Sequence, residues 1–132
     1  MAKIIVIDDE EDVRDVLKQV LQRAGYDVSV ASGGKEGIEL LQNEGADLVI
    51  TDVIMPGIDG VTTVKKIREK FRNTRILVIS GGGNVAPKSY EPDAISTTAF
   101  LSSAKNAGAD GTLTKPFDRQ ELIDVIKELL DD

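Results

Sequence analysis

The chain of 132 residues contains no cysteine, no histidine and no tryptophan, and it has only two tyrosines and three phenylalanines. Without cysteine, disulfides and thiolate metal sites are excluded. Without histidine, the chain has no histidine base, no histidine metal ligand and no residue that could become phosphohistidine. Any nucleophile that the chain supplies is therefore a carboxylate, a hydroxyl or an amine.

Positive charge and long hydrophobic runs are also scarce. Sixteen lysines and arginines stand against 23 aspartates and glutamates, and the net charge of −7 argues against nucleic acid as a direct partner. The first apolar run meets Asp8 too early to be a signal peptide or a membrane span, so we expect a cytosolic chain with no membrane partner. The length fits a single domain, residues 1–132, and nothing in the sequence suggests an appended output domain.

Five short apolar runs alternate with amphipathic segments. The runs predict strands at 3–7, 26–31, 47–51, 75–80 and 111–114, each followed by a helix, of which the one before about residue 107 is the weakest. In the last helix, Asp118 and Glu121 fit the N-cap and N3 places of a capping box. The alternation predicts an α/β fold, a doubly wound five-stranded parallel sheet with helices on both faces. The residues that repeat at helical spacing are Val13, Val16, Leu17, Val20, Leu21, Ala24, Ile38, Leu40, Leu41, Val61, Val64, Ile67, Phe71, Leu122, Val125, Ile126 and Leu129.

Chemically active side chains stand where four of these strands end. Asp8 and Asp9 follow the first strand, Asp52 the third, Ser80 closes the fourth and Lys115 follows the fifth. The carboxyl ends of parallel strands meet at one edge of the sheet, so these side chains should converge. Alone, each reads more simply as a cap, turn or surface residue. Together, the carboxylates would repel one another unless a hard cation such as Mg²⁺ joined them.

Such a site suits phosphoryl transfer. Asp52 could act as the nucleophile, as carboxylates do in aspartyl-phosphate chemistry. Lys115 and the metal would neutralise the charge on the phosphoryl oxygens, and Ser80 could donate a hydrogen bond to the new phosphoryl group. The sequence therefore predicts a phosphorylatable carboxylate beside a magnesium site.

These residues also carry a resemblance to a known family, which covers almost the whole chain. The Asp8-Asp9 pair, the segment from Asp52 to Gly60, Ser80 and the Lys115-Pro116-Phe117 run resemble, in their order and spacing, the receiver domain of two-component response regulators. The resemblance implies a flavodoxin-like sheet with strand order 2-1-3-4-5. It also implies a signalling switch that is no enzyme beyond its own phosphorylation and dephosphorylation.

The resemblance implies a role for each matching residue. Asp52 would be the phosphoacceptor, Asp9 a direct Mg²⁺ ligand and Asp8 a ligand through water. The main-chain carbonyl of Ile54 would complete the protein's ligands. The remaining assignments are Ser80 as the switch hydroxyl and Lys115 as the phosphate-binding lysine, with a cis bond between Lys115 and Pro116.

The implied partners are a sensor histidine kinase or a histidine phosphotransfer protein, which would donate the phosphoryl group, and an unidentified output protein. A phosphorylation-dependent dimer through the last helices stays open.

A rival interpretation is a Mg²⁺-dependent phosphohydrolase that uses Asp52 on a substrate. Such an enzyme would need a second carboxylate two residues after Asp52 as its general acid, and Ile54 occupies that place. A flavin-binding protein is disfavoured by the few aromatic residues and the acidic strand ends. A basic run is either a partner face or a solvated helix face: Lys65, Lys66, Arg68, Lys70, Arg72 and Arg75.

Two features depart from the family pattern. Thr112 occupies the place where many receivers carry an aromatic switch residue, and the segment from Gly81 to Ser96 is longer than usual. We hypothesise that this segment, with Tyr90 as its aromatic residue, orders around the phosphorylated site, although a passive insertion is an equal alternative. The positions that flank the phosphoryl group in the family correspond here to Ile54 and Gly82. Neither side chain can orient an attacking water, which predicts slow dephosphorylation.

Overall fold

A computed structural model describes residues 2–52, 60–80, 105–114 and 117–130. Within these residues no helix is long and apolar enough to cross a membrane. Residues 105–107 are helical and precede the last strand, at the end of the weakest predicted helix. The strands and longer helices are β1 (Lys3–Ile7), α1 (Glu11–Arg23), β2 (Asp27–Ala31), α2 (Gly34–Glu44), β3 (Leu48–Asp52), α3 (Gly60–Lys70), β4 (Arg75–Ser80), β5 (Gly111–Thr114) and α5 (Arg119–Leu130).

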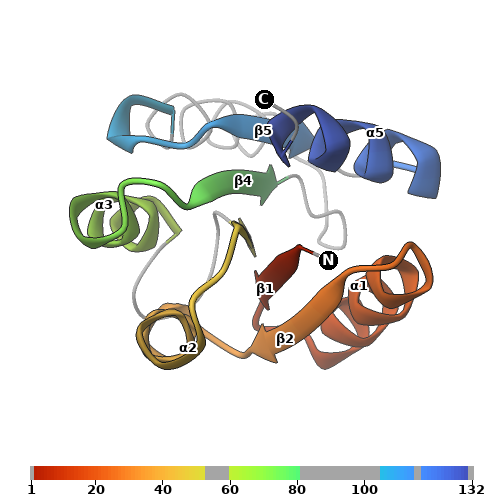
Figure 1. Ribbon diagram of the computed structural model, residues 1–132, viewed down its shortest axis with the longest axis horizontal. Helices are drawn as coiled ribbons and strands as arrows, with labels where there is room; N and C mark the ends of the chain where they lie inside the picture. Colours follow the sequence, from red (N-terminus) through yellow and green to blue (C-terminus); the bar gives the residue numbers. More distant parts are fainter. Residues whose placement is uncertain (1, 53–59, 81–104, 115–116, 131–132) are drawn as a thin grey trace, which may run out of the picture.

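The five strands form one parallel sheet in the order β2-β1-β3-β4-β5. The predicted fold class and strand order are both confirmed. In Figure 1 α1 and α5 lie on one side of the sheet, and α2 and α3 lie on the other. Right-handed crossovers account for the placement of α1, α2 and α3. The step from β1 to β2 runs in one direction along the sheet and the steps from β2 to β3 and β4 run in the other, so α1 lies on one face and α2 and α3 lie on the opposite face.

The central strands are apolar on both faces because both faces are covered. In β1, Ile4 and Val6 pack with α1 and α5, whereas Ile5 and Ile7 pack with α2 and α3. Successive side chains of a strand point to opposite faces, so a strand between two helical layers loses the apolar–polar alternation of a half-exposed one. Burial on both faces therefore explains why the apolar runs in the sequence are uninterrupted.

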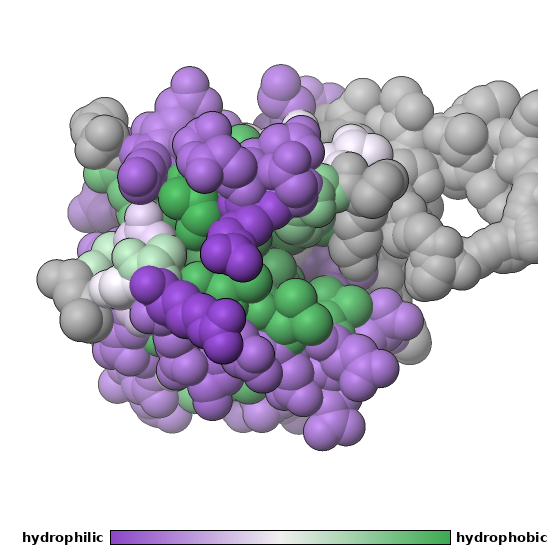
Figure 2. All heavy atoms as spheres, turned by 90° about the vertical axis from the view of Figure 1, so that its right-hand side faces the viewer, coloured by the Kyte–Doolittle hydropathy of each residue, from purple (hydrophilic) through white to green (hydrophobic). Residues whose placement is uncertain are grey.

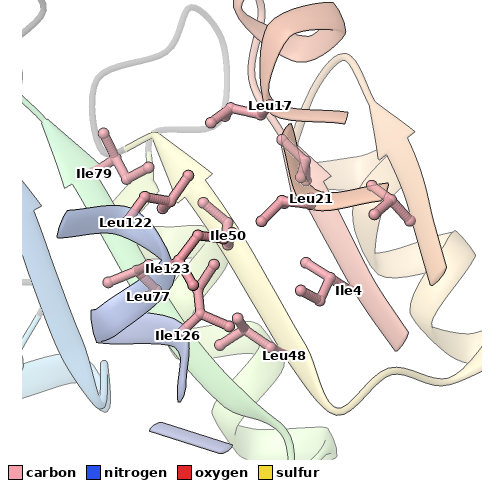
Figure 3. Packing of buried hydrophobic residues seen from close by; sticks show 12 residues of the cluster. Ile4, Leu17, Leu21, Leu48, Ile50, Leu77, Ile79, Leu122, Ile123 and Ile126 are labelled. Carbon is pink, nitrogen blue, oxygen red and sulfur yellow. The ribbon is translucent and has the colours of Figure 1, made fainter. Parts of the chain in front are cut away.

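Figure 3 shows the layer between the sheet and the pair α1 and α5. Leu21 of α1, Ile50 of β3 and Ile126 of α5 are each at most 1% exposed. A fully buried leucine or isoleucine stabilises the fold by about 1.5–3 kcal/mol relative to an exposed one. Val16 belongs to the helical repeat of α1 but is 60% exposed, because Leu17 and Leu21 carry the buried face of that helix.

The helix ends follow the signals in the sequence. At the start of α5, the main-chain N–H of Glu121 donates to Asp118 Oδ1 at 2.8 Å, and the N–H of Asp118 donates to Glu121 Oε1 at 3.0 Å. This reciprocal pair is the predicted capping box. After α1 and α2, Gly25 and Gly45 adopt φ values of +100° and +74°, which a residue with a side chain rarely tolerates.

Candidate functional site

The strand register brings three predicted site residues to one edge of the sheet. Ile7 of β1 pairs with Thr51 of β3, so Asp8 follows β1 beside the place where Asp52 closes β3. Asp52 in turn pairs with Ile79 of β4, one residue before Ser80. The structure therefore confirms that these strand ends meet, as the parallel sheet required.

The carboxylates of Asp8, Asp9 and Asp52 converge. Each offers one oxygen, and these three oxygens all lie within 4.8 Å of one another. Asp8 is 3% exposed and Asp52 is 9% exposed, whereas Asp9 is exposed to solvent. Crowding like charges at a partly buried site is costly, and a hard divalent cation with oxygen ligands offsets that cost. The donor set therefore fits Mg²⁺.

Three hydrogen bonds hold the turn that carries Asp8. Its N–H donates to the carbonyl oxygen of Ala31 at 3.1 Å, and its Oδ1 accepts from the N–H of Glu10 at 2.9 Å. Arg14 Nη1 donates to its main-chain carbonyl oxygen at 2.7 Å. We did not anticipate Arg14 from the sequence. Its one signal is that it is the only basic residue between Asp8 and Leu17.

The ends of β1 and β3 are supported from the α2 and α3 side. Gly37 of α2 approaches Ile7 so closely that a Cβ atom there would collide with the isoleucine side chain. Thr51 is fully buried, and its hydroxyl donates to the carbonyl oxygen of Asp52 at 3.1 Å. The two strand ends are thus fixed by packing before any ligand is considered.

The other predicted site residues are placed in part or lie outside the described residues. Ser80 ends β4 and pairs with Thr114 of β5, whose end leads to Lys115. Thr112 lies in β5, half-buried and paired with Val78 of β4. The predictions for Ile54, Gly82, Lys115, Pro116 and the segment from Gly81 to Ser96 concern residues outside those that the structure describes.

Two carboxylates at the ends of α2 have shifted pKa values. Glu36 accepts hydrogen bonds from the main-chain N–H and then the hydroxyl of Ser32, both at 2.8 Å, and these lower its pKa. At the other end, the pKa of Glu44 is lowered by the ammonium of Lys3 at 2.8 Å and by the hydroxyl of Ser29 at 2.9 Å. In both cases the hydrogen bonds favour the charged form.

Comparison with known proteins identifies the family. Residues 4–127 match the model of the response regulator receiver domain. Over 120 residues, 91% of its length, the chain is 39% identical to an uncharacterized transcriptional regulatory protein, YrkP, of Bacillus subtilis (strain 168). The chain spans 46% of the length of that relative.

Solved structures agree with this match over nearly the whole chain. The chemotaxis protein CheY4 of Vibrio cholerae is 30% identical, with 98% of this chain and 99% of that chain covered and a TM-score of 0.81. A putative response regulator from Chloroflexus aurantiacus is 31% identical, with 99% and 98% covered and a TM-score of 0.82. With its sheet order, its acidic strand ends and these matches, the chain belongs to the response regulator receiver domain family of two-component signalling systems.

Proposed function

We propose that this receiver domain is a phosphorylation-dependent switch, with Asp52 as the phosphoacceptor. The observation that carries the proposal is the convergence of Asp8, Asp9 and Asp52 within 4.8 Å at the carboxyl edge of the sheet. Asp52 is the carboxylate at the end of a central strand, flanked by β1 and β4. A nucleophile in that place is held by the rigid sheet and faces the crevice where α/β proteins bind ligands.

The reaction is transfer of a phosphoryl group to a carboxylate. A carboxylate oxygen of Asp52 attacks phosphorus, and the bond between phosphorus and the donor's leaving atom breaks. The leaving group departs with the bonding electron pair and takes up a proton from solvent. The product is an aspartyl phosphate, an acyl phosphate of high transfer potential. Ser80 and Lys115 would bind its phosphoryl oxygens, the first by a hydrogen bond and the second by its charge.

The carboxylates of Asp9 and Asp52 would hold Mg²⁺ directly, with Asp8 acting through water and the carbonyl oxygen of Ile54 as a further ligand. When bound, Mg²⁺ supplies positive charge to the phosphoryl oxygens. The protein's own contribution is to keep the carboxylates in place. The hydrogen bond from Arg14 to the carbonyl oxygen of Asp8 serves that purpose, because it fixes the turn without occupying a carboxylate.

The donor would be a phosphohistidine on a sensor histidine kinase or on a phosphotransfer protein, in the cytosol. Lacking histidine, the chain can accept a phosphoryl group in such a relay but cannot present a phosphohistidine. The output would be altered binding to a partner protein or to a second copy of the chain. We expect this change to begin at Ser80. This residue closes β4, which lies between β5 and β3, the strand that carries Asp52.

Intact-mass spectrometry tests the proposal. The chain is incubated with acetyl phosphate in Mg²⁺ and, separately, in EDTA. A single phosphate adduct should form in Mg²⁺ only, and hydroxylamine should remove it, because hydroxylamine cleaves acyl phosphates and leaves phosphoserine and phosphothreonine intact. An adduct that resists hydroxylamine would contradict the assignment to a carboxylate. Steady hydrolysis of phosphate esters without an adduct would favour the phosphohydrolase instead.

A further inference from the structure

The phosphorylation site leaves one charged region of the chain unexplained. Six of the 16 lysines and arginines fall between residues 65 and 75, where Glu69 is the single acidic residue. This concentration is unusual in a chain whose net charge is −7. On α3 and just beyond its end, Lys65, Arg68 and Arg72 recur at intervals of three and four residues, so they share one face of the helix.

That face borders a hollow. The structure has a cavity of about 670 Å³ between α3 and the helical residues before β5, lined by Lys65, Arg68 and Arg72 on one side and by Asn106 and Ala107 on the other. In Figure 1 α3 and the segment before β5 lie next to each other at the edge of the molecule. The volume is within the range of small-ligand sites, and the hollow is open to solvent along α3.

Arg68 makes one wall of this hollow rigid. Its guanidinium forms an ion pair with Asp110 at 2.5 Å and donates to the carbonyl oxygens of Gly108 at 3.2 Å and Arg72 at 2.7 Å. Asp110 also accepts the N–H of Ile76 at 2.8 Å. These contacts tie α3 to β4 and to the approach to β5, so the two sides of the hollow are held at a fixed spacing.

Lys65 and Arg72 differ from Arg68 in their exposure to solvent and in their lack of an ion-pair partner within the described part of the chain. Both are exposed, and among the described residues neither has a carboxylate within ion-pair distance. Glu69 lies in the same lining, and Arg68 is already paired with Asp110, so Lys65 and Arg72 are two further cations beside one carboxylate. Val61 and Ala107 add partly buried apolar surface to the lining.

From this arrangement we propose that the hollow between α3 and residues 106–107 binds a short acidic segment of a partner protein. Acidic side chains would pair with Lys65 and Arg72, and an apolar side chain would contact Val61 and Ala107. The 11 residues of α3 measure roughly 16 Å along the helix axis, and Val61 and Arg72 lie near its two ends. An extended peptide of about five residues spans that distance. The proposal does not rest on phosphorylation of Asp52.

A peptide fits this surface better than nucleic acid does. The negative net charge repels a long polyanion over the whole molecule, and the described basic lining is confined to one hollow. A short acidic peptide is repelled less, because all its charges lie within about a Debye length of the hollow and more distant acidic groups of the protein are screened by salt. Its affinity should fall as salt is added, as for other partly exposed ion pairs.

The test uses the unphosphorylated chain and three labelled probes at low ionic strength, measured by fluorescence anisotropy. The first probe is a capped hexapeptide of five glutamates and one leucine, the second replaces glutamate by lysine, and the third is a short oligothymidylate. The double variant Lys65→Glu/Arg72→Glu reverses the two charges that face the hollow. Its matched control, Lys66→Glu/Lys70→Glu, makes the same charge change at exposed lysines of α3 outside the lining.

The acidic peptide should bind the wild-type chain and the control, with control affinity reduced less than about threefold, whereas the hollow variant should lose about tenfold or more. The lysine peptide should not bind at this surface. Equal weakening by both variants would reduce the effect to a general charge field and overturn the proposal. Tighter binding of oligothymidylate than of peptide, or no binding of the acidic peptide to the wild type, would overturn it as well. Circular dichroism of both variants confirms that the exposed substitutions leave the fold intact.

Discussion

The carboxylates at the two edges of the sheet have opposite kinds of neighbour: a shared cation at the amino edge and other carboxylates at the carboxyl edge. At the amino edge, Lys3 stands among acidic groups: its ammonium lies 3.7 Å from Asp27 and 2.8 Å from Glu44, and its N–H donates to Asp47 at 2.9 Å. Ser29 joins the same network, accepting from Lys3 at 2.8 Å and donating to Glu44 at 2.9 Å. Here the acidic groups surround a cation, which is an arrangement that stabilises the fold.

At the carboxyl edge the acidic groups face one another. Oxygens of Asp8, Asp9 and Asp52 lie within 4.8 Å, on a turn and a strand end that packing and main-chain hydrogen bonds keep in place. Two unit charges at that separation repel by about 0.9 kcal/mol even at the dielectric constant of water, and by more near a protein surface. The amino edge thus contributes stability, whereas the carboxyl edge loses some of it by crowding three carboxylates that could hold a cation.

The largest expected effect compares one aspartate from each edge. Asp52→Asn should abolish the phosphate adduct formed with acetyl phosphate and Mg²⁺, because it removes the proposed nucleophile while keeping the shape of the side chain. Asp47→Asn, at the amino edge, should leave the rate of adduct formation within about twofold of the wild type, since its carboxylate bonds only to structure at the far side of the sheet. Intact-mass time courses of the two variants measure both. Phosphorylation of Asp52→Asn at the wild-type rate would refute the contrast.

A smaller effect is expected from the cation of the amino edge. Lys3→Met should lower the melting temperature by a few degrees, because it leaves Glu44 and Asp27 without their shared ammonium and Ser29 without a donor. The exposed Lys35 of α2, for which the structure gives no ion pair among its described residues, provides the control Lys35→Met, with a shift close to zero. Thermal unfolding followed by circular dichroism compares them. Equal shifts for the two variants would mean that the amino-edge network contributes no stability.

The smallest effect concerns Glu36, which belongs neither to the Lys3 network nor to the cluster of Asp8, Asp9 and Asp52. Hydrogen bonds from Ser32 lower its pKa, so its carboxylate contributes stability in full above the ordinary value of 4.5 and loses it as the pH falls further, through the pKa of the folded state. Because the group is mostly exposed, Glu36→Gln should cost only a few tenths of a kcal/mol at neutral pH, and the difference should vanish in acid. Urea titrations at neutral pH and near pH 3 measure it. A deficit that persists unchanged in acid would contradict this account.

Much of this fold could be predicted from the sequence, for a physical reason. The strands β4 and β5 begin and end where the apolar runs do, and β3 is shifted by one residue so that Asp52 lies within it. A strand that is buried on both faces needs an uninterrupted run of apolar residues. The capping box needs only Asp118 and Glu121, which form its two hydrogen bonds and are three residues apart. Both signals are local, so a sequence displays them directly.

The rest of the site depends on contacts between distant segments. The close approach of Gly37 to Ile7 and the bond from Arg14 to Asp8 have no periodic signature, because they arise only once helix and strand are packed. The exposure of Val16 shows the same limit: helical spacing places it near a buried face but cannot say which residues α5 and the sheet cover. The convergence of Asp8, Asp9 and Asp52 was predictable because parallel topology alone brings strand ends together.

The most direct test of the contrast between the edges is the stability of Asp9→Asn with and without Mg²⁺. Asp9 is exposed and close to the start of α1, where a negative charge gains about 0.3–1 kcal/mol from the helix dipole. Repulsion from two neighbouring carboxylates exceeds that gain. In EDTA the variant should therefore unfold at a higher urea concentration than the wild type.

With Mg²⁺ at ten times its dissociation constant, the wild type should gain about 1.4 kcal/mol of unfolding free energy, and the variant should gain far less. Those two results together would establish that the carboxyl edge sacrifices stability for a metal. A variant that is less stable than the wild type in EDTA, or that gains as much from Mg²⁺, would contradict the account.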